Sequence, residues 1–149
     1  MASDGREYER QNREQRERLV RLGQLLDAPH WGARLPNGWT VAAAFGHLGF
    51  WDRVTLAAIE RYEREGVTPV KNDFHLINGV LPALFERMSV EQCRSWAVDS
   101  AEAVDARIAA LSPAMVEEII QKDGERRIHR HIHRRNHLDQ IESALRLAD

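Results

Sequence analysis

Two histidines near the C-terminus, His133 and His137, have the spacing that most directly suggests chemistry. Four residues make slightly more than one turn of an α-helix, so the two imidazoles lie one above the other on the same face. Ile141, Ala144 and Leu145 continue this face, which is predicted to point toward the apolar interior. Two imidazoles at this spacing can bind one metal ion, but a stable site usually needs a third protein ligand.

The strongest candidate for that third ligand is His47, which lies in another segment of helical character. The residues around it on the predicted helix are nearly all apolar: Ala43, Ala44, Phe50, Trp51, Val54 and Ala58. A neutral imidazole in such surroundings needs a polar partner. For His47 alone, a hydrogen-bonded core histidine is the simpler interpretation. Its combination with an inward-facing histidine pair favours a metal site formed by His47, His133 and His137, because facing helices of a bundle assemble such sites.

The residues around these histidines resemble the DinB-like superfamily. The similarity is carried by Trp39-Thr40-Val41, His47-Leu48 and Trp51-Asp52, and much later by His133, His137, Leu138 and Gln140-Ile141. The superfamily includes metal-dependent thiol transferases and the N-terminal domain of mycothiol-dependent maleylpyruvate isomerases. The resemblance implies that one histidine of the second helix and a histidine pair of the last helix bind a divalent metal. In this chain these are His47, His133 and His137, within a single domain that covers residues 1–149.

The resemblance also implies a fold and a range of activities. The fold is a helical bundle with up-down-down-up order. In the superfamily, low-molecular-weight thiols are transferred or double bonds isomerised at the metal, and related bundles include a hydrolase that uses bound water. The isomerases carry an additional C-terminal domain, and this chain ends at Asp149, so we do not expect that isomerase activity here.

Three neutral imidazoles would leave a metal ion its full charge and at least one open coordination position. Water or a thiol bound there would lose its proton near neutral pH and become a nucleophile for a small electrophilic substrate. Zinc is favoured on general grounds, and nickel, iron and manganese also suit nitrogen ligands.

Several polar residues near the pair are candidates for supporting roles. Gln140 is about one turn from His137, and Arg134 and Asn136 are close to the histidine face in sequence. Asn136 and Asp52 are weaker candidates for contacts behind the metal ligands. The alternative for each is an ordinary solvent-facing residue, although we favour Arg134 as a contact for an anionic ligand.

The start of the last predicted helix is strongly basic. It contains Arg126, Arg127, Arg130, Arg134 and Arg135, together with His129 and His131. We expect these two histidines, and most of the arginines, to face solvent. The formal net charge of the whole chain is −2, and no aromatic residues alternate with the basic ones, so a nucleic-acid partner is not expected.

Helical periodicity predicts an all-α protein, a four-helix bundle with a long crossover. The first helix spans residues 6–26, and its polar first half is expected to be solvated unless Tyr8, Gln11 and Gln15 extend the apolar stripe. A loop with Trp31, a candidate cover for a pocket, spans residues 28–38. Thr40 starts a helix to residue 65, a short helix spans 74–87, Ser89 and Ser112 start two more, and the last covers 125–147.

The overall composition suits a soluble domain of ordinary size. The chain has 149 residues and a single cysteine, Cys93, which excludes an intrachain disulfide and indicates a reducing compartment such as the cytoplasm. Cys93 falls on a core stripe and is expected to be buried rather than reactive. Neither a signal peptide nor a membrane span is expected, because no apolar segment approaches the required length.

Three functions are compatible with these features. The first is a metal-dependent transferase or hydrolase that activates a thiol or water. The second is a bundle that binds a metal or small ligand without turnover, for example in stress response or sequestration. The third is a structural helical protein, either monomeric or dimeric, whose histidines are satisfied by hydrogen bonds alone.

Overall fold

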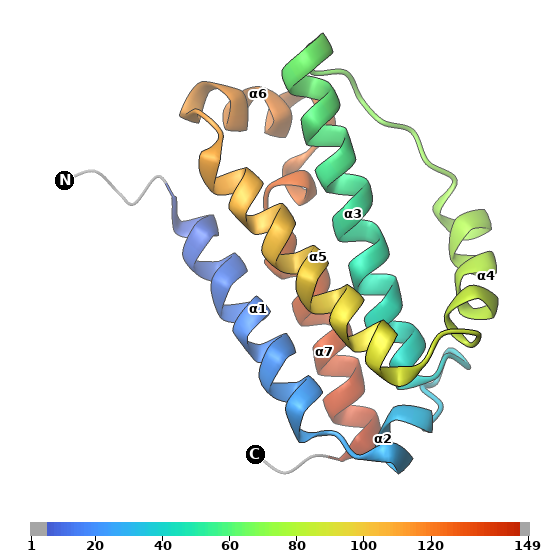
Figure 1. Cartoon of the computed structure of the whole chain (residues 1–149). Coiled ribbons are helices and arrows are strands. Elements are labelled where there is room, and N and C mark those ends of the chain that lie inside the picture. Colours follow the sequence, from blue (N-terminus) through green and yellow to red (C-terminus); the bar gives the residue numbers. More distant parts are fainter. Residues whose placement is uncertain (1–5, 147–149) are drawn as a thin grey trace.

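Four long helices form an elongated bundle: α1 (Glu7–Leu25), α3 (Val41–Glu65), α5 (Val90–Ala110) and α7 (Arg130–Leu145). The computed structural model describes residues 6–146. In Figure 1, α1 and α7 run in one direction, and α3 and α5 run in the other. α3 packs against α5 along most of its length, α1 contacts α5 and α7, and α7 also contacts α3. The predicted all-α fold is therefore confirmed.

Shorter helices connect these four: α2 (Ala28–Gly32), α4 (Phe74–Phe85), α6 (Pro113–Asp123) and the 3₁₀ helix η1 (Glu125–Arg127). The chain after α3 descends along one side of the bundle and forms α4 before α5 begins (Figure 1). This long connection allows α5 to run parallel to α3, which a tight turn would prevent.

The predicted capping residues begin three of the helices. The Thr40 Oγ1 accepts a hydrogen bond from the Ala43 amide at 3.0 Å and starts α3. Ser89 and Gln92 form a reciprocal capping box at the start of α5, and Ser112 caps α6 before Pro113. These side chains satisfy amides that have no partner within the first turn of a helix.

Three predicted boundaries differ from the structure. The predicted loop at 28–38 contains α2, and α4 ends at Phe85 instead of residue 87. The last helix does not begin at Glu125, because η1 ends at Arg127 and the fully buried Ile128 turns into the core before α7 starts. Leu147, its predicted end, lies outside the described residues.

Two glycines allow α3 to approach its neighbours closely. A methyl group on Gly46 would overlap the Phe85 ring of α4, and one on Gly49 would overlap the Trp96 side chain of α5. These two glycines lie on either side of His47 in the sequence, so the close packing fixes the part of α3 that carries this histidine.

The core confirms some predicted positions and corrects others. Leu19 and Leu22 of α1 and Cys93 of α5 are buried as expected. The polar first half of α1 is not simply solvated, because Tyr8 and Asn12 are both buried. Trp31 does not cover a pocket: it is buried against Phe45, and its indole N–H donates to the Leu26 carbonyl.

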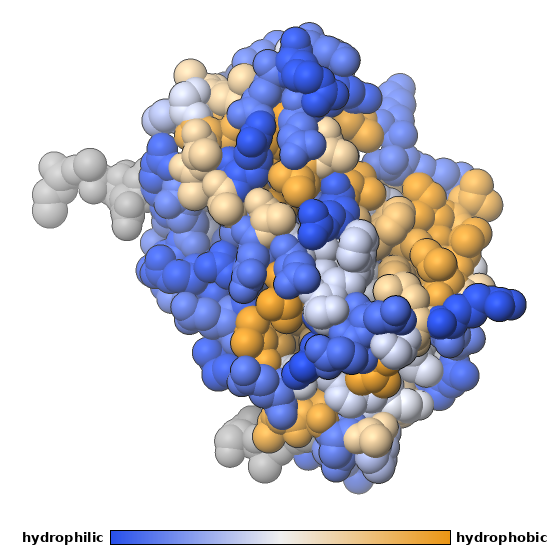
Figure 2. Space-filling view, in the orientation of Figure 1, coloured by the Kyte–Doolittle hydropathy of each residue, from blue (hydrophilic) through white to orange (hydrophobic). Residues whose placement is uncertain are grey.

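One surface region is more apolar than the rest. Four apolar side chains of α4 are at least half exposed: Phe74, Leu76, Val80 and Leu84. Figure 2 shows hydrophobic residues gathered on the side of the molecule where α4 lies. Within residues 6–146, no helix combines the length and apolar character that a membrane span needs.

Candidate metal centre

The three predicted histidines converge between α3 and α7. The Nε2 atoms of His47 and His133 are 3.0 Å apart. The ring centroid of His137 lies 4.6 Å from that of His47 and 4.8 Å from that of His133. Each histidine offers a ring nitrogen to the space between them, and these nitrogens all lie within 4.8 Å of one another.

This arrangement fits a divalent metal ion. Zinc–nitrogen bonds of about 2.1 Å in a tetrahedral site place the ligand nitrogens about 3.4 Å apart. The Nε2 atoms of His47 and His133 are 3.0 Å apart, and all three histidine nitrogens lie within 4.8 Å of one another. The Nδ1 atoms of His47 and His133 are buried and have no hydrogen-bond partner among the described residues. The protein therefore leaves these imidazoles only partly satisfied, which is unusual for buried polar groups.

All three imidazoles are held in the neutral form that metal binding requires. Burial, together with the neighbouring His137 and Arg130, lowers the pKa of His47 from 6.5 to about 3. Burial and Arg130 also hold the pKa of His133 well below its ordinary value. Burial lowers the pKa of His137, and the Gln140 side chain opposes that shift. Near neutral pH, the ring nitrogens are therefore available as electron-pair donors.

The histidines line a pocket of about 790 Å³. The Trp39 ring meets the His47 ring edge-on, with centroids 4.9 Å apart, and restricts the orientation of this imidazole. Trp51 and Phe74 also line the pocket, and the Trp51 indole donates to the Asn78 side chain at 2.9 Å. A volume of this size and an aromatic wall are typical of sites for small molecules.

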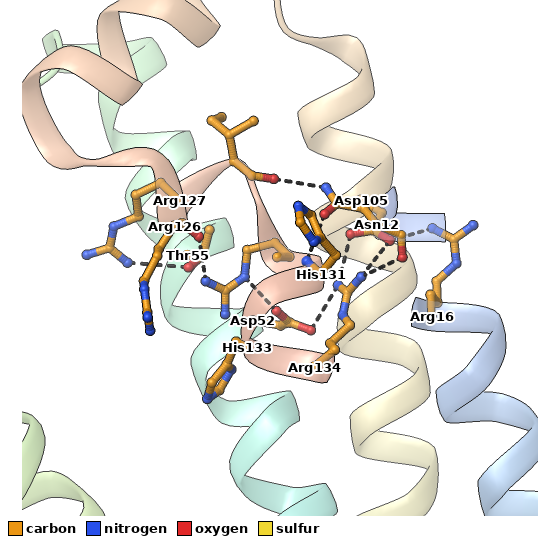
Figure 3. A network of polar contacts seen from close by, with 12 residues as sticks. Asn12, Arg16, Asp52, Thr55, Asp105, Arg126, Arg127, His131, His133 and Arg134 are labelled. Atoms are coloured by element: carbon orange, nitrogen blue, oxygen red, sulfur yellow. Dashed lines mark hydrogen bonds and ion pairs between the residues drawn. The ribbon is translucent and has the colours of Figure 1, made fainter. Parts of the chain in front are cut away.

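A buried ionic network lies beside the histidines. Arg134 is fully buried; its guanidinium donates two hydrogen bonds of 2.9 Å to Asp105 and one of 3.1 Å to Asp52. Burial alone would lower the pKa of Arg134, but the two carboxylates raise it. Figure 3 shows Arg134 between these aspartates, while the preceding His133 points to the other side of α7.

The network corrects the interpretation of the basic segment. We expected Arg134 to be available to an anionic ligand, but Asp52 and Asp105 already occupy both of its terminal nitrogens. Asp52 also accepts a hydrogen bond of 2.9 Å from Nε of Arg130, another arginine that is buried and not solvated. Asp52 of α3 therefore holds α7 in place through Arg130 and Arg134, and does so behind the histidines.

Asn12 of α1 fixes the beginning of α7. Its side-chain oxygen accepts from the His131 amide and its nitrogen donates to the Ile128 carbonyl, both at 2.9 Å. No side chain of α7's own segment caps this helix, so a residue from the other end of the chain does so. His131 is consequently buried, and the prediction that it faces solvent is wrong.

His129 is half-buried, with its ring against Tyr8 at a centroid distance of 5.7 Å. It does not line the pocket.

A second polar group, centred on Asp123, lines the same pocket. Asp123 accepts hydrogen bonds from the Tyr62 hydroxyl, from the Val70 amide at 3.0 Å and from Nε of Arg127 at 2.8 Å. Arg127 also donates to the Thr55 hydroxyl at 3.3 Å (Figure 3). These contacts join α3, the connection that follows it and the end of α6 around the pocket.

Two proposed supporting residues lie outside the pocket wall. Gln140 and Asn136 are both exposed and do not line the cavity. Gln140 is near enough to His137 to affect its pKa, whereas within residues 6–146 no hydrogen bond connects the Asn136 side chain with the histidines. The sequence interpretation missed Arg130, which lines the pocket directly.

Most of the chain matches a known protein family. A model described as the DinB superfamily covers residues 11–141, a range that contains the whole histidine cluster and both aspartates of the ionic network. Searches of curated proteins and of solved structures found no significant match.

Proposed function

Because the chain belongs to the DinB superfamily, we propose that it is a divalent-metal-dependent enzyme whose ligands are His47, His133 and His137. The observation that supports this most strongly is the convergence of three imidazoles, each with a lowered pKa, at the wall of a pocket. The superfamily includes metal-binding enzymes of thiol chemistry. A transferase or hydrolase acting on a small electrophilic compound is the activity that we infer.

The metal would supply one kind of chemistry: it would lower the pKa of a thiol or water molecule to near neutrality. The chain's own residues prepare the site for it. Arg130 adds positive charge that helps to keep His47 and His133 unprotonated, and Trp39 orients His47. Zinc is our first choice, with nickel, iron and manganese as further candidates.

Elemental analysis of tag-free protein tests the metal site. We expect about one divalent ion per chain in the wild type and a strongly reduced content in His133→Ala, because two ligands hold a metal poorly. His129→Ala is the matched control: it removes a half-buried histidine outside the pocket and should leave the metal content unchanged. Equal metal content in wild type and His133→Ala would refute the proposed ligand set.

A thiol-transfer assay separates the enzyme from a bundle that binds metal without turnover. The reaction is the attack of a small thiol on an aryl chloride, which forms a carbon–sulfur bond and releases chloride and a proton. We expect the metal-loaded protein to accelerate it and His47→Ala to abolish the acceleration. A protein that retains its metal but accelerates neither thiol transfer nor ester hydrolysis would support the binding function instead.

A further inference from the structure

Arg130 is an arginine whose donors are only partly used by the protein. Its side chain is 7% exposed. Of its five N–H groups, the one on Nε donates to Asp52 at 2.9 Å and one on Nη1 donates to the Arg126 carbonyl at 2.8 Å. The remaining three have no partner among the described residues. Nη2 is not sealed from solvent, and the open space that Arg130 lines is the pocket.

The position of Arg130 relative to the histidines is set by α7. It precedes His133 by three residues, so the two side chains lie on neighbouring parts of the same helix face. Arg130 also lines the same pocket as His133 and His47. A group bound to Arg130 would therefore lie next to the histidine cluster.

Three arginines line the pocket, and they differ in how far the protein uses their hydrogen-bond donors. Arg127 is held by Asp123 and Thr55. The exposed Arg126 lines the pocket and its guanidinium has no ion pair or hydrogen bond among residues 6–146. Two acidic residues also line the pocket: Asp123 is paired with Arg127, and Glu125 is exposed.

We infer that Arg130, assisted by Arg126, binds the carboxylate of the substrate or co-substrate beside the histidine cluster, with the apolar part of that molecule against Trp51 and Phe74. The inference depends on the proposed function for its role in catalysis, but the binding site itself needs no metal. A carboxylate is favoured over a neutral group because a buried, positively charged guanidinium with unused donors gains most from an anionic acceptor. The aromatic wall favours a flat or apolar body.

Titration of the full-length, zinc-supplemented protein with benzoate, followed by tryptophan fluorescence, tests this inference. Trp39 and Trp51 line the pocket and report on its occupancy. We expect benzoate to bind at least about tenfold more tightly than benzyl alcohol, which has the same ring without the charge. Equal binding of the two would overturn the inference, as would inorganic phosphate displacing benzoate more effectively than acetate does.

Two variants and a matched control locate the site. Arg130→Lys keeps the charge beside Asp52 but loses the planar fork, and it should weaken benzoate binding about fivefold. Arg126→Gln changes an exposed residue, so the fold should be retained, and it should weaken binding about threefold. Arg135→Gln removes an exposed arginine outside the pocket and should have no effect. Equal affinities in all three variants would overturn the inference.

The same samples separate this inference from the metal proposal. Zinc binding by calorimetry should be unchanged in Arg126→Gln, and benzoate binding should persist in protein treated with a chelator. Zinc binding without selective benzoate binding would overturn only the carboxylate site. Benzoate binding without zinc binding would support the carboxylate site and refute the metal proposal.

Discussion

Two polar clusters lie in the interior of the bundle on either side of α7, and they differ in how fully the protein satisfies them. The ionic network around Arg134 pairs its buried charges with one another, and within residues 6–146 Nε is the one Arg134 nitrogen without a partner. The histidine cluster has two buried ring nitrogens without partners and borders an open pocket. The comparison favours a structural role for the first cluster and agrees with the metal site that we propose at the second.

The two clusters are also connected through Asp52. Asp52 receives hydrogen bonds from Arg130, which lines the pocket, and from Arg134, which does not. The network therefore holds α7 against α3 at the level where their histidines meet.

The largest expected effect is that of Arg134→Met. It removes the charge but keeps a long apolar side chain, so Asp105 loses its bidentate partner in a buried position. We expect a loss of about 3–5 kcal/mol in the free energy of unfolding, measured in urea. Arg135→Met, one residue further on the exposed face, is the control and should change stability by less than about 0.5 kcal/mol. A loss below about 1 kcal/mol in Arg134→Met would show that the network is not structural.

Zinc should stabilise the wild type by an amount that the histidine variants lose. At a free concentration of 100 times its dissociation constant, an ion that binds only the folded state adds about 2.7 kcal/mol. For a domain of this size, this corresponds to roughly 8 °C in Tm. His137→Ala should show no such shift in a thermal melt. An equal shift in wild type and variant would place the zinc elsewhere.

Metal-free protein should lose stability as the pH falls below about 6.5. The pKa values of His47, His133 and His137 are all lowered in the folded state, so the unfolded chain takes up protons first. As the pH falls, each histidine then reduces the free energy of unfolding by up to about 1.4 kcal/mol per pH unit. For His47 this loss continues until the pH reaches the folded-state pKa of about 3.

Urea unfolding of wild type and His47→Gln between about pH 7 and pH 4 measures this effect. The free energy of unfolding should depend less steeply on pH in the variant. In the wild type, His47 takes up a proton in the unfolded state at a pH where the folded state leaves it neutral, and the variant lacks this group. Parallel curves would mean that His47 protonates with the same pKa in both states.

The smallest effect is expected for Gln140→Ala. Gln140 is exposed and does not line the pocket, so stability should change by less than about 0.5 kcal/mol. Zinc affinity by calorimetry should fall by less than about threefold, since the loss concerns a contact behind one imidazole. A tenfold loss would extend the binding cluster to this residue.

Sequence periodicity was sufficient to predict the part of the site that depends on one helix face. His133 and His137 share a face because of their spacing, and His47 was selected by its apolar neighbours. The ionic network was not predicted, because the partners of Arg134 come from three other helices, up to 122 positions away. Asp105 carried the missing signal: it shares a helix face with Ala101 and Ile108, and a carboxylate among such residues requires a cation.

The dependence of α7 on Asn12 has a consequence during biosynthesis. On the ribosome, α1 leaves the exit tunnel long before Ile128 and His131, the two residues that its asparagine binds. The helix that carries His133 and His137 therefore obtains its cap only after the residues between Asn12 and His131 have emerged. A nascent chain stalled before this point would expose His47 to the cell without the partners that complete its site.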